Sequence, residues 1–321
     1  MGRIHDRINL ICLPITLCVL VWITASTAAE ADDFELVGYL PDYRIGGYPV
    51  EKAKLLDRII IFSASPTING GLDTSVIDRH MPAIYAIKTH CKDLSLCVGG
   101  WERGKLFHVV AGSPKMRAEF VKATLSYCQT HGFTGVDLDW EFPRTPKEVD
   151  DYTKLLAAFH QACRQLNMQL SIAMSAHHTL PTPAFAYVDR VHLMAYDHGG
   201  RHATVLRVTQ DAQSLINHRV PSEKILLGIP FYARGIKQRN RVKTYAEIVR
   251  QHSPDTQTDE VDDMFFNGPA TVKRKTDFAR RAGLGGMMIW EIGQDVHDGN
   301  GLLNVLSNHI RSPGTTLIKR D

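Results

Sequence analysis

The sequence predicts an α/β fold in which eight parallel strands close into a barrel ringed by helices, a (β/α)8 barrel. Short apolar, β-rich segments recur eight times, and helical stretches lie between them. This alternation is typical of a parallel sheet covered by helices. Pro and Gly residues are scattered through the chain, and no low-complexity linker divides it. We therefore expect one domain over residues 32–312 and a C-terminal tail over residues 313–321.

The expected strands lie where apolar runs are short and rich in β-branched residues. They cover residues 34–40, 58–62, 94–98, 135–139, 169–174, 190–195, 224–229 and 286–290. Runs such as Ile59-Ile60-Ile61 are typical of strands buried on both faces. An open doubly wound sheet is the rival architecture, but it usually carries a glycine-rich phosphate turn after its first strand. Gly38-Tyr39-Leu40-Pro41 is not such a turn.

The expected helices cover residues 114–129, 146–166, 208–218, 245–251 and 269–281. Pro114 and Pro146 suit the first turn of a helix, where the missing N–H costs nothing. Only about fifty residues separate Arg234 from Gly285. Because this span already includes a helix or two, we expect no extra α+β insertion in it.

The N-terminus resembles a secretory signal peptide over residues 1–31. Arg3 and Arg7 precede an apolar run from about residue 10 to 23, and small residues follow over 25–31. The run is shorter than the roughly twenty residues of a membrane-spanning helix, and Pro14 interrupts it, so a retained anchor is the weaker alternative. We expect a secreted or periplasmic protein with no membrane association after cleavage.

Composition narrows the class of partner. The 321 residues carry a formal net charge of +3 and are 44% hydrophobic, which indicates a globular protein without a nucleic-acid partner. We expect a monomer. One segment is densely basic, with Arg234, Lys237, Arg239, Arg241 and Lys243. It is either a solvated loop or a site for an anionic polymer such as a cell-wall glycan.

Four cysteines follow the signal segment. They are Cys91, Cys97, Cys128 and Cys163. An even number fits disulfides in an oxidising compartment, but a core of this size needs no covalent cross-link. Disulfides and buried free thiols therefore both stay open, and no pairing is predicted.

The segment 135–143 holds three carboxylates on alternate residues of an expected strand. Side chains alternate across a strand, so Asp137, Asp139 and Glu141 share one face. The opposite face receives Val136, Leu138, Trp140 and Phe142. Neighbouring buried carboxylates cannot all be ionised, and burial should raise the pKa of Asp137. We interpret the row as a graded acid set with one general acid, the alternative being a solvated edge strand.

These residues resemble the signature of glycoside hydrolase family 18, the chitinase family, Asp-x-x-Asp-x-Asp-x-Glu. The matching segment is 134–141, and Thr134 stands where the family has its first Asp. Further pieces with family-like sequence follow in the family's order, namely Gly38-Tyr39, Gly99-Gly100-Trp101, Met194-Ala195-Tyr196-Asp197, residues 228–234 and residues 286–290. Ala233 replaces a usual Gly. The loss of the Asp at Thr134 should shorten the relay behind the catalytic row.

The resemblance implies a role for each candidate residue at the barrel mouth. Glu141 would be the acid and then the base, Asp139 would orient and charge-stabilise the substrate's acetamido group, and Asp137 would hold the proton that Asp139 needs. Tyr196 would hydrogen-bond the acetamido carbonyl, and Trp290 would form the floor under the sugar; both also fit as ordinary core residues. The remaining lining residues would be Tyr39, Trp101, Asp197, Tyr232 and Arg234.

No metal or other cofactor is expected. His177-His178 follow the fifth strand, and His198 and His202 are four apart after the sixth. These histidines do not form a known ligand set.

The resemblance implies a retaining, substrate-assisted hydrolase whose partner is chitin or an N-acetylglucosamine-containing oligosaccharide. A chitinase or chitooligosaccharidase that cleaves β-1,4 bonds is the leading hypothesis. An endo-β-N-acetylglucosaminidase acting on N-glycans or a cell-wall glycan is the second. A non-catalytic chitin-binding lectin on the same barrel is the third.

Overall fold

A computed structural model describes residues 2, 34–91, 93–178 and 180–312. The predicted tail over 313–321 and, apart from Gly2, the predicted signal peptide lie outside the described residues. The compact unit that begins at residue 33 holds all of the described helices and strands. None of the helices in the described part of the chain has the length and apolar character needed to span a membrane.

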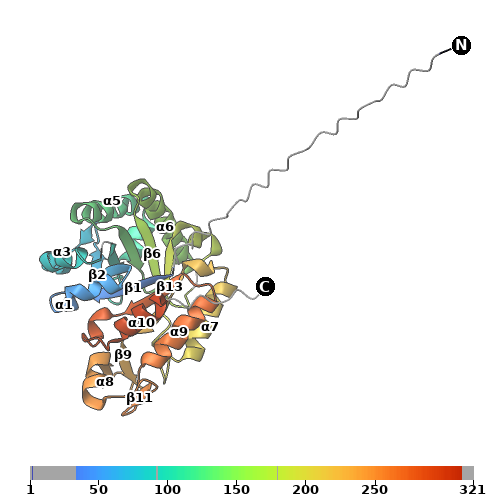
Figure 1. Cartoon of the computed structure of the whole chain (residues 1–321). Helices are drawn as coiled ribbons and strands as arrows, with labels where there is room; N and C mark the ends of the chain where they lie inside the picture. Colours follow the sequence, from blue (N-terminus) through green and yellow to red (C-terminus); the bar gives the residue numbers. More distant parts are fainter. Residues whose placement is uncertain (1, 3–33, 92, 179, 313–321) are drawn as a thin grey trace. The chain divides into compact units, whose positions relative to one another are not determined.

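Eight parallel strands form a closed barrel (Figure 1). Around the ring the order is β1-β13-β8-β7-β6-β5-β4-β2, and β1 pairs with β2 to complete it. The strands are β1 (Glu35–Pro41), β2 (Arg58–Pro66), β4 (Leu94–Gly99), β5 (Gly135–Asp139), β6 (Gln169–Met174), β7 (Arg190–Leu193), β8 (Ile225–Pro230) and β13 (Gly286–Trp290). The predicted (β/α)8 barrel is confirmed, and β2 continues past its predicted end at Phe62 to Pro66.

The helices pack on the outside of the barrel and on a small sheet that follows β8 (Figure 1). They are α1 (Asp42–Ile45), α2 (Ser75–Asp78), α3 (Met81–Lys88), α4 (Phe107–Gly112), α5 (Pro114–His131), α6 (Pro146–Leu166), α7 (Val205–Asn217), α8 (Tyr245–His252), α9 (Pro269–Arg281) and α10 (Leu302–Arg311). Short 3-10 segments join them, namely η1 (Val50–Leu55), η2 (Thr182–Tyr187), η3 (Ser222–Lys224) and η4 (Ile292–Gln294). The five predicted helices are present as α5 to α9.

Local sequence explains where the two longest helices begin. The Ser113 side chain accepts a hydrogen bond from the Met116 backbone N–H at the start of α5. Thr145 and Glu148 form a reciprocal capping box at the start of α6. Such caps satisfy N–H groups that have no partner within the helix, and each stabilises a helix by about 1 kcal/mol.

The apolar core has two parts because barrel strands bury both faces. The larger cluster joins the helices to the outward-facing residues of the strands, among them Val136, Leu138 and Trp140. A smaller cluster combines residues from strands on opposite sides of the ring and therefore fills the interior: Val37, Tyr39, Ile60, Phe62, Cys97, Leu226 and Met288. The interior is a packed layer beneath the mouth, by which we mean the C-terminal ends of the barrel strands.

A small antiparallel sheet follows β8, in the span where we expected no α+β insertion. Its strands pair in the order β10-β9-β12-β11. They are β9 (Tyr232–Gly235), β10 (Val242–Thr244), β11 (Glu260–Val261) and β12 (Met264–Phe265), and α8 lies between β10 and β11 in the chain. The short strand β3 (Leu72–Asp73) likewise adds to β2 in the antiparallel sense. All four strands of the small sheet have four residues or fewer, and α9 and the last barrel strand, β13, follow it in the chain.

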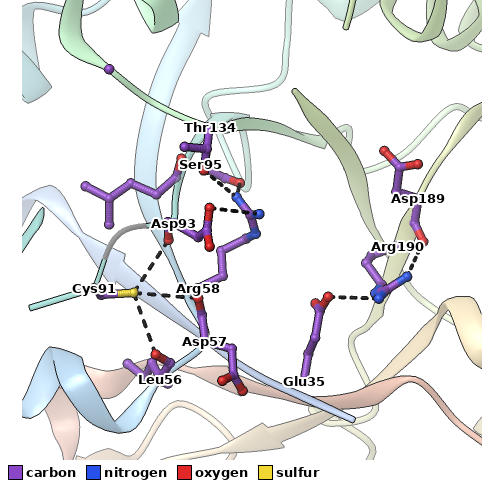
Figure 2. Close-up of polar contacts among 12 residues, drawn as sticks. Glu35, Leu56, Asp57, Arg58, Cys91, Asp93, Ser95, Thr134, Asp189 and Arg190 are labelled. Atoms are coloured by element: carbon purple, nitrogen blue, oxygen red, sulfur yellow. Dashed lines mark hydrogen bonds and ion pairs between the residues drawn. The ribbon is translucent and has the colours of Figure 1, made fainter. Parts of the chain in front are cut away.

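The four cysteines of the described chain are free and buried. Of the two alternatives left open by the sequence, the structure therefore has thiols instead of disulfides. The Cys91 thiol lies 3.6 Å from the Asp93 carbonyl oxygen and 3.7 Å from those of Leu56 and Asp57 (Figure 2).

Because Thr134 directly precedes β5, it lies at the floor of the barrel, the end opposite the mouth; Figure 2 shows its contact with Arg58. Nη1 of Arg58 donates to Thr134 Oγ1 at 3.0 Å and to Ser95 Oγ at 3.1 Å. A second floor contact joins Arg190 Nη2 to Glu35 Oε1 at 2.8 Å. In this chain the position thus carries a contact to Arg58 at the floor, and β5 leads from there to the acid row.

Candidate active site

The three carboxylates of the row are buried to different degrees. Asp137 is 0% exposed, Asp139 is 3% exposed and Glu141 is half-buried beyond the end of β5. Alternation holds as far as Trp140, which packs in the outer cluster. Phe142 departs from it, because its ring stacks on His178 with the centroids 4.0 Å apart instead of joining the outer layer.

Asp137 is an acceptor for three side chains inside the barrel. Tyr39 Oη lies 2.7 Å from its Oδ2, and Ser171 Oγ lies 2.6 Å from its Oδ1. His192 Nδ1 lies 3.0 Å from the same Oδ1. Burial alone would raise the pKa of Asp137, but the charge interaction with His192 and the three hydrogen bonds outweigh burial and lower it. The expectation of a raised pKa was wrong because it counted burial and like charge but not these donors.

Asp139 has the opposite electrostatics. Burial, then the charges of Glu141 and Asp137, raise its pKa well above the usual value. Its Oδ1 is buried without a hydrogen-bond partner among the described residues. The directions of the two pKa shifts therefore favour a proton on Asp139 over one on Asp137, the reverse of the distribution that we expected.

Glu141 titrates near neutrality. Burial raises its pKa to about 7, a hydrogen bond from the Trp101 backbone opposes this, and the charge of Asp197 adds to it. A carboxyl with this pKa is protonated in about half of the molecules at pH 7, which suits a general acid.

Two glycines let the end of β4 approach the row. Gly99 and Gly100 have φ angles of 104° and 92°, a backbone conformation that residues other than glycine rarely adopt. A Cβ at Gly99 would lie 2.3 Å from the carbonyl oxygen of Asp139, and one at Gly100 would lie 2.2 Å from the Phe62 ring. The Gly100 N–H donates to that same Asp139 oxygen at 2.7 Å.

Aromatic side chains flank the row at the mouth. The Trp290 ring lies 4.9 Å from Phe62 and 5.6 Å from Tyr39, measured between centroids. Tyr39 connects Trp290 to the row through its hydrogen bond to Asp137. Trp101, directly after the two glycines, is 65% exposed, so its ring is free to contact a ligand.

A second polar group is centred on Asp197. Tyr232 Oη donates to its Oδ1 at 2.6 Å, and Arg234 reaches both carboxylate oxygens, with Nε 2.9 Å from Oδ1 and Nη2 3.0 Å from Oδ2. Burial would raise the pKa of Asp197, but its hydrogen bonds and the Arg234 charge lower it. Tyr196 lies beside this group, its ring centroid 6.3 Å from that of Tyr232.

Much of the basic segment makes contacts within the protein. Arg239 Nη2 donates to the Asp197 carbonyl oxygen at 2.6 Å. Arg241 pairs with Asp262 at 2.9 Å, and Lys243 donates to Gln251 at 2.7 Å. These contacts favour the interpretation of the segment as a surface loop over that of a polyanion site.

The histidines singled out in the sequence do not converge. His198 Nε2 lies 2.8 Å from Asp211 Oδ2, whereas His202 packs against Tyr232. His178 stacks on Phe142, and His177 is exposed. Within residues 34–312 as described, no group of three or more His, Cys, Asp or Glu side chains could hold a metal ion.

Sequence reasoning missed several residues near the mouth or below it. His192, in the barrel interior, looks like any core residue in the run of β7 and is placed beside Asp137 only by the closed barrel. Tyr43, which is 62% exposed, and Arg44, whose Nε lies 3.2 Å from Glu291, follow β1 and line a hollow of about 240 Å³. An exposed aromatic directly after a barrel strand is a signal that could have identified Tyr43.

Comparison with known proteins agrees with the fold and the motifs. Residues 35–295 match the model of glycosyl hydrolases family 18. Endochitinase 1 of Metarhizium robertsii is 23% identical, over 87% of this chain and 84% of the relative. A chitinase from Bacteroides thetaiotaomicron has a TM-score of 0.80 at 21% identity, over 90% of this chain and all of that chain. The GH18 chitinase from Cycas revoluta in complex with (GlcNAc)3 has a TM-score of 0.74 at 22% identity, over 86% and 99% of the two chains. The family match spans most of the sequence, and the chain therefore belongs to glycosyl hydrolases family 18.

Proposed function

We propose that this protein is a secreted chitinase or chitooligosaccharidase that cleaves β-1,4 bonds between N-acetylglucosamine units with retention at the anomeric carbon. The observation that carries the proposal is the graded row of carboxylates. Asp137 is buried within hydrogen-bond distance of three side chains, burial raises the pKa of Asp139, and Glu141 beyond the end of β5 has a pKa raised to about 7. Family membership and relatives named as chitinases support it.

The row offers one general acid but no second carboxylate suited to attack the sugar. Glu141 is half-buried at the mouth, where a glycosidic oxygen can approach it, whereas Asp139 is buried and its pKa is raised well above the usual value. Retaining enzymes with two carboxylates need one of them as an ionised nucleophile about 5 Å from the acid. Substrate assistance removes that need, because the acetamido oxygen of the sugar itself attacks the anomeric carbon.

The reaction then has two steps with Glu141 in both. Glu141 gives its proton to the leaving oxygen while the acetamido oxygen closes an oxazolinium ring on the sugar. Next, the Glu141 carboxylate takes a proton from a water that opens this ring from the opposite side, so the two inversions give net retention. A residue that alternates as acid and base works best with a pKa near the operating pH, as Glu141 has.

Asp139 and Tyr196 act on the acetamido group. As positive charge develops there, the Asp139 proton passes to Asp137 below it, and the Asp139 carboxylate then stabilises the oxazolinium. Burial raises the pKa of Tyr196 well above its usual value, so its hydroxyl stays a donor for the acetamido oxygen. Trp290 offers an aromatic face to the apolar face of the sugar ring.

The test compares wild type with Glu141→Gln on chitotriose and on a glycopeptide that carries the chitobiose core. We expect wild type to cleave chitotriose and Glu141→Gln to lose a factor of about 10² to 10⁴ in kcat, the usual worth of a general acid. Glu119→Gln is the matched control, because Glu119 is an exposed residue of α5 whose one ion pair within the described residues is with Lys115, at 3.9 Å. Equal activity of wild type and Glu141→Gln would remove Glu141 from its role.

The alternatives give different results in the same assay. Cleavage of the glycopeptide alone would replace the chitinase by an endo-β-N-acetylglucosaminidase, which the same acid row would serve. Binding of chitotriose without hydrolysis of either substrate would indicate a lectin. Export is tested separately by mass spectrometry of the N-terminus of the released protein, which we expect near residue 32.

A further inference from the structure

His192 lies at the centre of the barrel interior, below the acid row. It is 0% exposed and comes from β7, whereas its partners come from β1 and β5. Nδ1 lies 3.0 Å from Asp137 Oδ1 and 2.9 Å from Tyr39 Oη. Of the described Lys, Arg and His side chains, His192 alone is within ion-pair distance of Asp137.

The hydrogen-bond geometry places a proton on Nδ1. Tyr39 has one hydroxyl proton, and its oxygen lies closer to Asp137 Oδ2, at 2.7 Å, than to His192, so the hydroxyl donates to Asp137. The Tyr39 oxygen is then an acceptor on the side of His192. An N–H on Nδ1 therefore donates to the Tyr39 oxygen and to Asp137 Oδ1, and Ser171 donates to Oδ1 as well.

Each of these groups donates to Asp137, and only an ionised carboxylate accepts at every position. His192 Nε2, by contrast, is buried without a partner among the described residues. The hydrogen bonds that His192 makes within the described residues are therefore all on the Nδ1 side of its ring.

The other titratable side chains near Asp137 are not cations that could take the place of His192. Cys97 on β4, Asp139 on β5 and Tyr152 on α6 are the remaining titratable side chains that interact with Asp137. All three are neutral acids in this environment, because burial raises the pKa of each. His192 is thus the one basic side chain of the described interior that acts directly on Asp137.

We propose that His192 is a positioning residue of this enzyme: its Nδ1–H holds Asp137 as an ionised acceptor beneath Asp139, ready to receive the Asp139 proton as the oxazolinium forms. This inference rests on the proposed function. His192 does not contact the sugar, and it acts on the reaction through Asp137 alone. An ordinary core histidine would fill space equally well but would not set the proton distribution of the row.

Two substitutions of His192 separate the effect of its hydrogen bond from the effect of its side-chain volume. His192→Asn keeps an N–H donor near the place of Nδ1, whereas His192→Leu keeps bulk and removes the donor. We expect His192→Leu to lower kcat on chitotriose at least about tenfold, equivalent to about 1.4 kcal/mol of barrier, with KM within about threefold. We expect His192→Asn to keep kcat within about threefold of wild type. His160→Leu, on the outer helix α6, is the matched control, since His160 Nδ1 contacts only the Tyr187 carbonyl oxygen.

A second measurement does not depend on turnover. Carboxyl carbon NMR of protein labelled at aspartate follows the titration of Asp137, assigned with Asp137→Asn. We expect the Asp137 carboxyl to titrate at higher pH in His192→Leu than in wild type, and at an almost unchanged pH in His192→Asn. Thermal unfolding verifies that each variant is folded.

The outcomes separate the two proposals. Unchanged kcat and unchanged Asp137 titration in folded His192→Leu would overturn the inference, as would equal losses in the Asn and Leu variants. If wild type hydrolyses neither substrate, the proposed function fails, yet the Asp137 titration still decides whether His192 sets its ionisation.

Discussion

The hydroxyl of Tyr39 lies 2.7 Å from Oδ2 of Asp137, so β1 and β5, the first and fourth barrel strands in chain order, are joined through the barrel interior. The same tyrosine packs against Trp290 at the mouth. Tyr39 therefore contacts both Trp290 at the mouth and Asp137, the deepest carboxylate of the acid row. Because the three carboxylates interact, their protons belong to the row as a whole and titrate together.

Activity should fall above about pH 7. Glu141 must be protonated to donate, and its pKa is raised to about 7, mainly by burial. We expect kcat/KM on chitotriose to decrease about tenfold for each pH unit above that value. This decrease is measured by the pH dependence of kcat/KM from pH 4 to 10. A decrease that begins only beyond pH 9 would show that another group donates the proton.

The same carboxyl should make stability depend on pH. Its pKa is higher in the folded state than the usual value of about 4.5, so the folded protein binds this proton more tightly than the unfolded chain. That contribution is fully present below about pH 4.5 and is lost as the pH rises through about 7. Glu141→Gln should therefore gain Tm relative to wild type between pH 5 and pH 8, while Glu119→Gln should follow wild type.

Replacement of Asp139 by Asn should separate binding from turnover. The amide keeps the shape of the protonated carboxyl but cannot become negative beside the oxazolinium. We expect kcat to fall by a factor of about 10² to 10³, the cost of losing one preorganised electrostatic group. Calorimetry with chitotriose should give an affinity close to that of wild type. Loss of binding with little change in kcat would identify Asp139 as a contact residue.

Tyr232→Phe should weaken the arrangement around Asp197. The substitution removes the 2.6 Å hydrogen bond to Asp197 Oδ1 and leaves Arg234 in place. We expect kcat/KM to fall by a factor of about 5 to 10, in line with about 1 to 1.5 kcal/mol for one hydrogen bond. Tyr85→Phe is the control, because the exposed Tyr85 hydroxyl contacts only His131. Equal kinetics in both variants would exclude a functional role of this bond.

Thr134→Val should affect stability but not catalysis. Its Oγ1 accepts from Arg58 at the barrel floor (Figure 2), and the valine removes that acceptor. We expect a loss of about 1 kcal/mol in the free energy of unfolding, measured with urea, and kcat/KM within about twofold of wild type. A large loss of activity in the folded variant would restore a link between Thr134 and the acid row.

The eight barrel strands could be predicted from the sequence because each is an apolar run that stands alone between polar segments. The capped helices α5 and α6 were equally visible. The small sheet β9 to β12 was not, because strands of two to four residues carry too little pattern to recognise. For similar reasons the short helices α1 to α4 escaped prediction.

The membership of the acid row followed from alternation along one strand, but its proton distribution did not. Asp137 receives its donors from Tyr39, Ser171 and His192, which lie 98, 34 and 55 residues away. Only the closed barrel brings these side chains together. The place of Thr134 could not be predicted either, because a match to a linear motif does not reveal at which residue the strand begins.

The burial of the four thiols has a practical consequence. Since none of Cys91, Cys97, Cys128 and Cys163 is oxidised, the described fold requires no oxidant to form and can be prepared in a reducing cytoplasm. Burial raises the pKa of Cys91 to about 11 and that of Cys163 to about 12, so neither is a ready nucleophile while the protein is folded. Alkylating reagents should label these side chains only when the barrel opens, which makes the rate of labelling a direct record of unfolding.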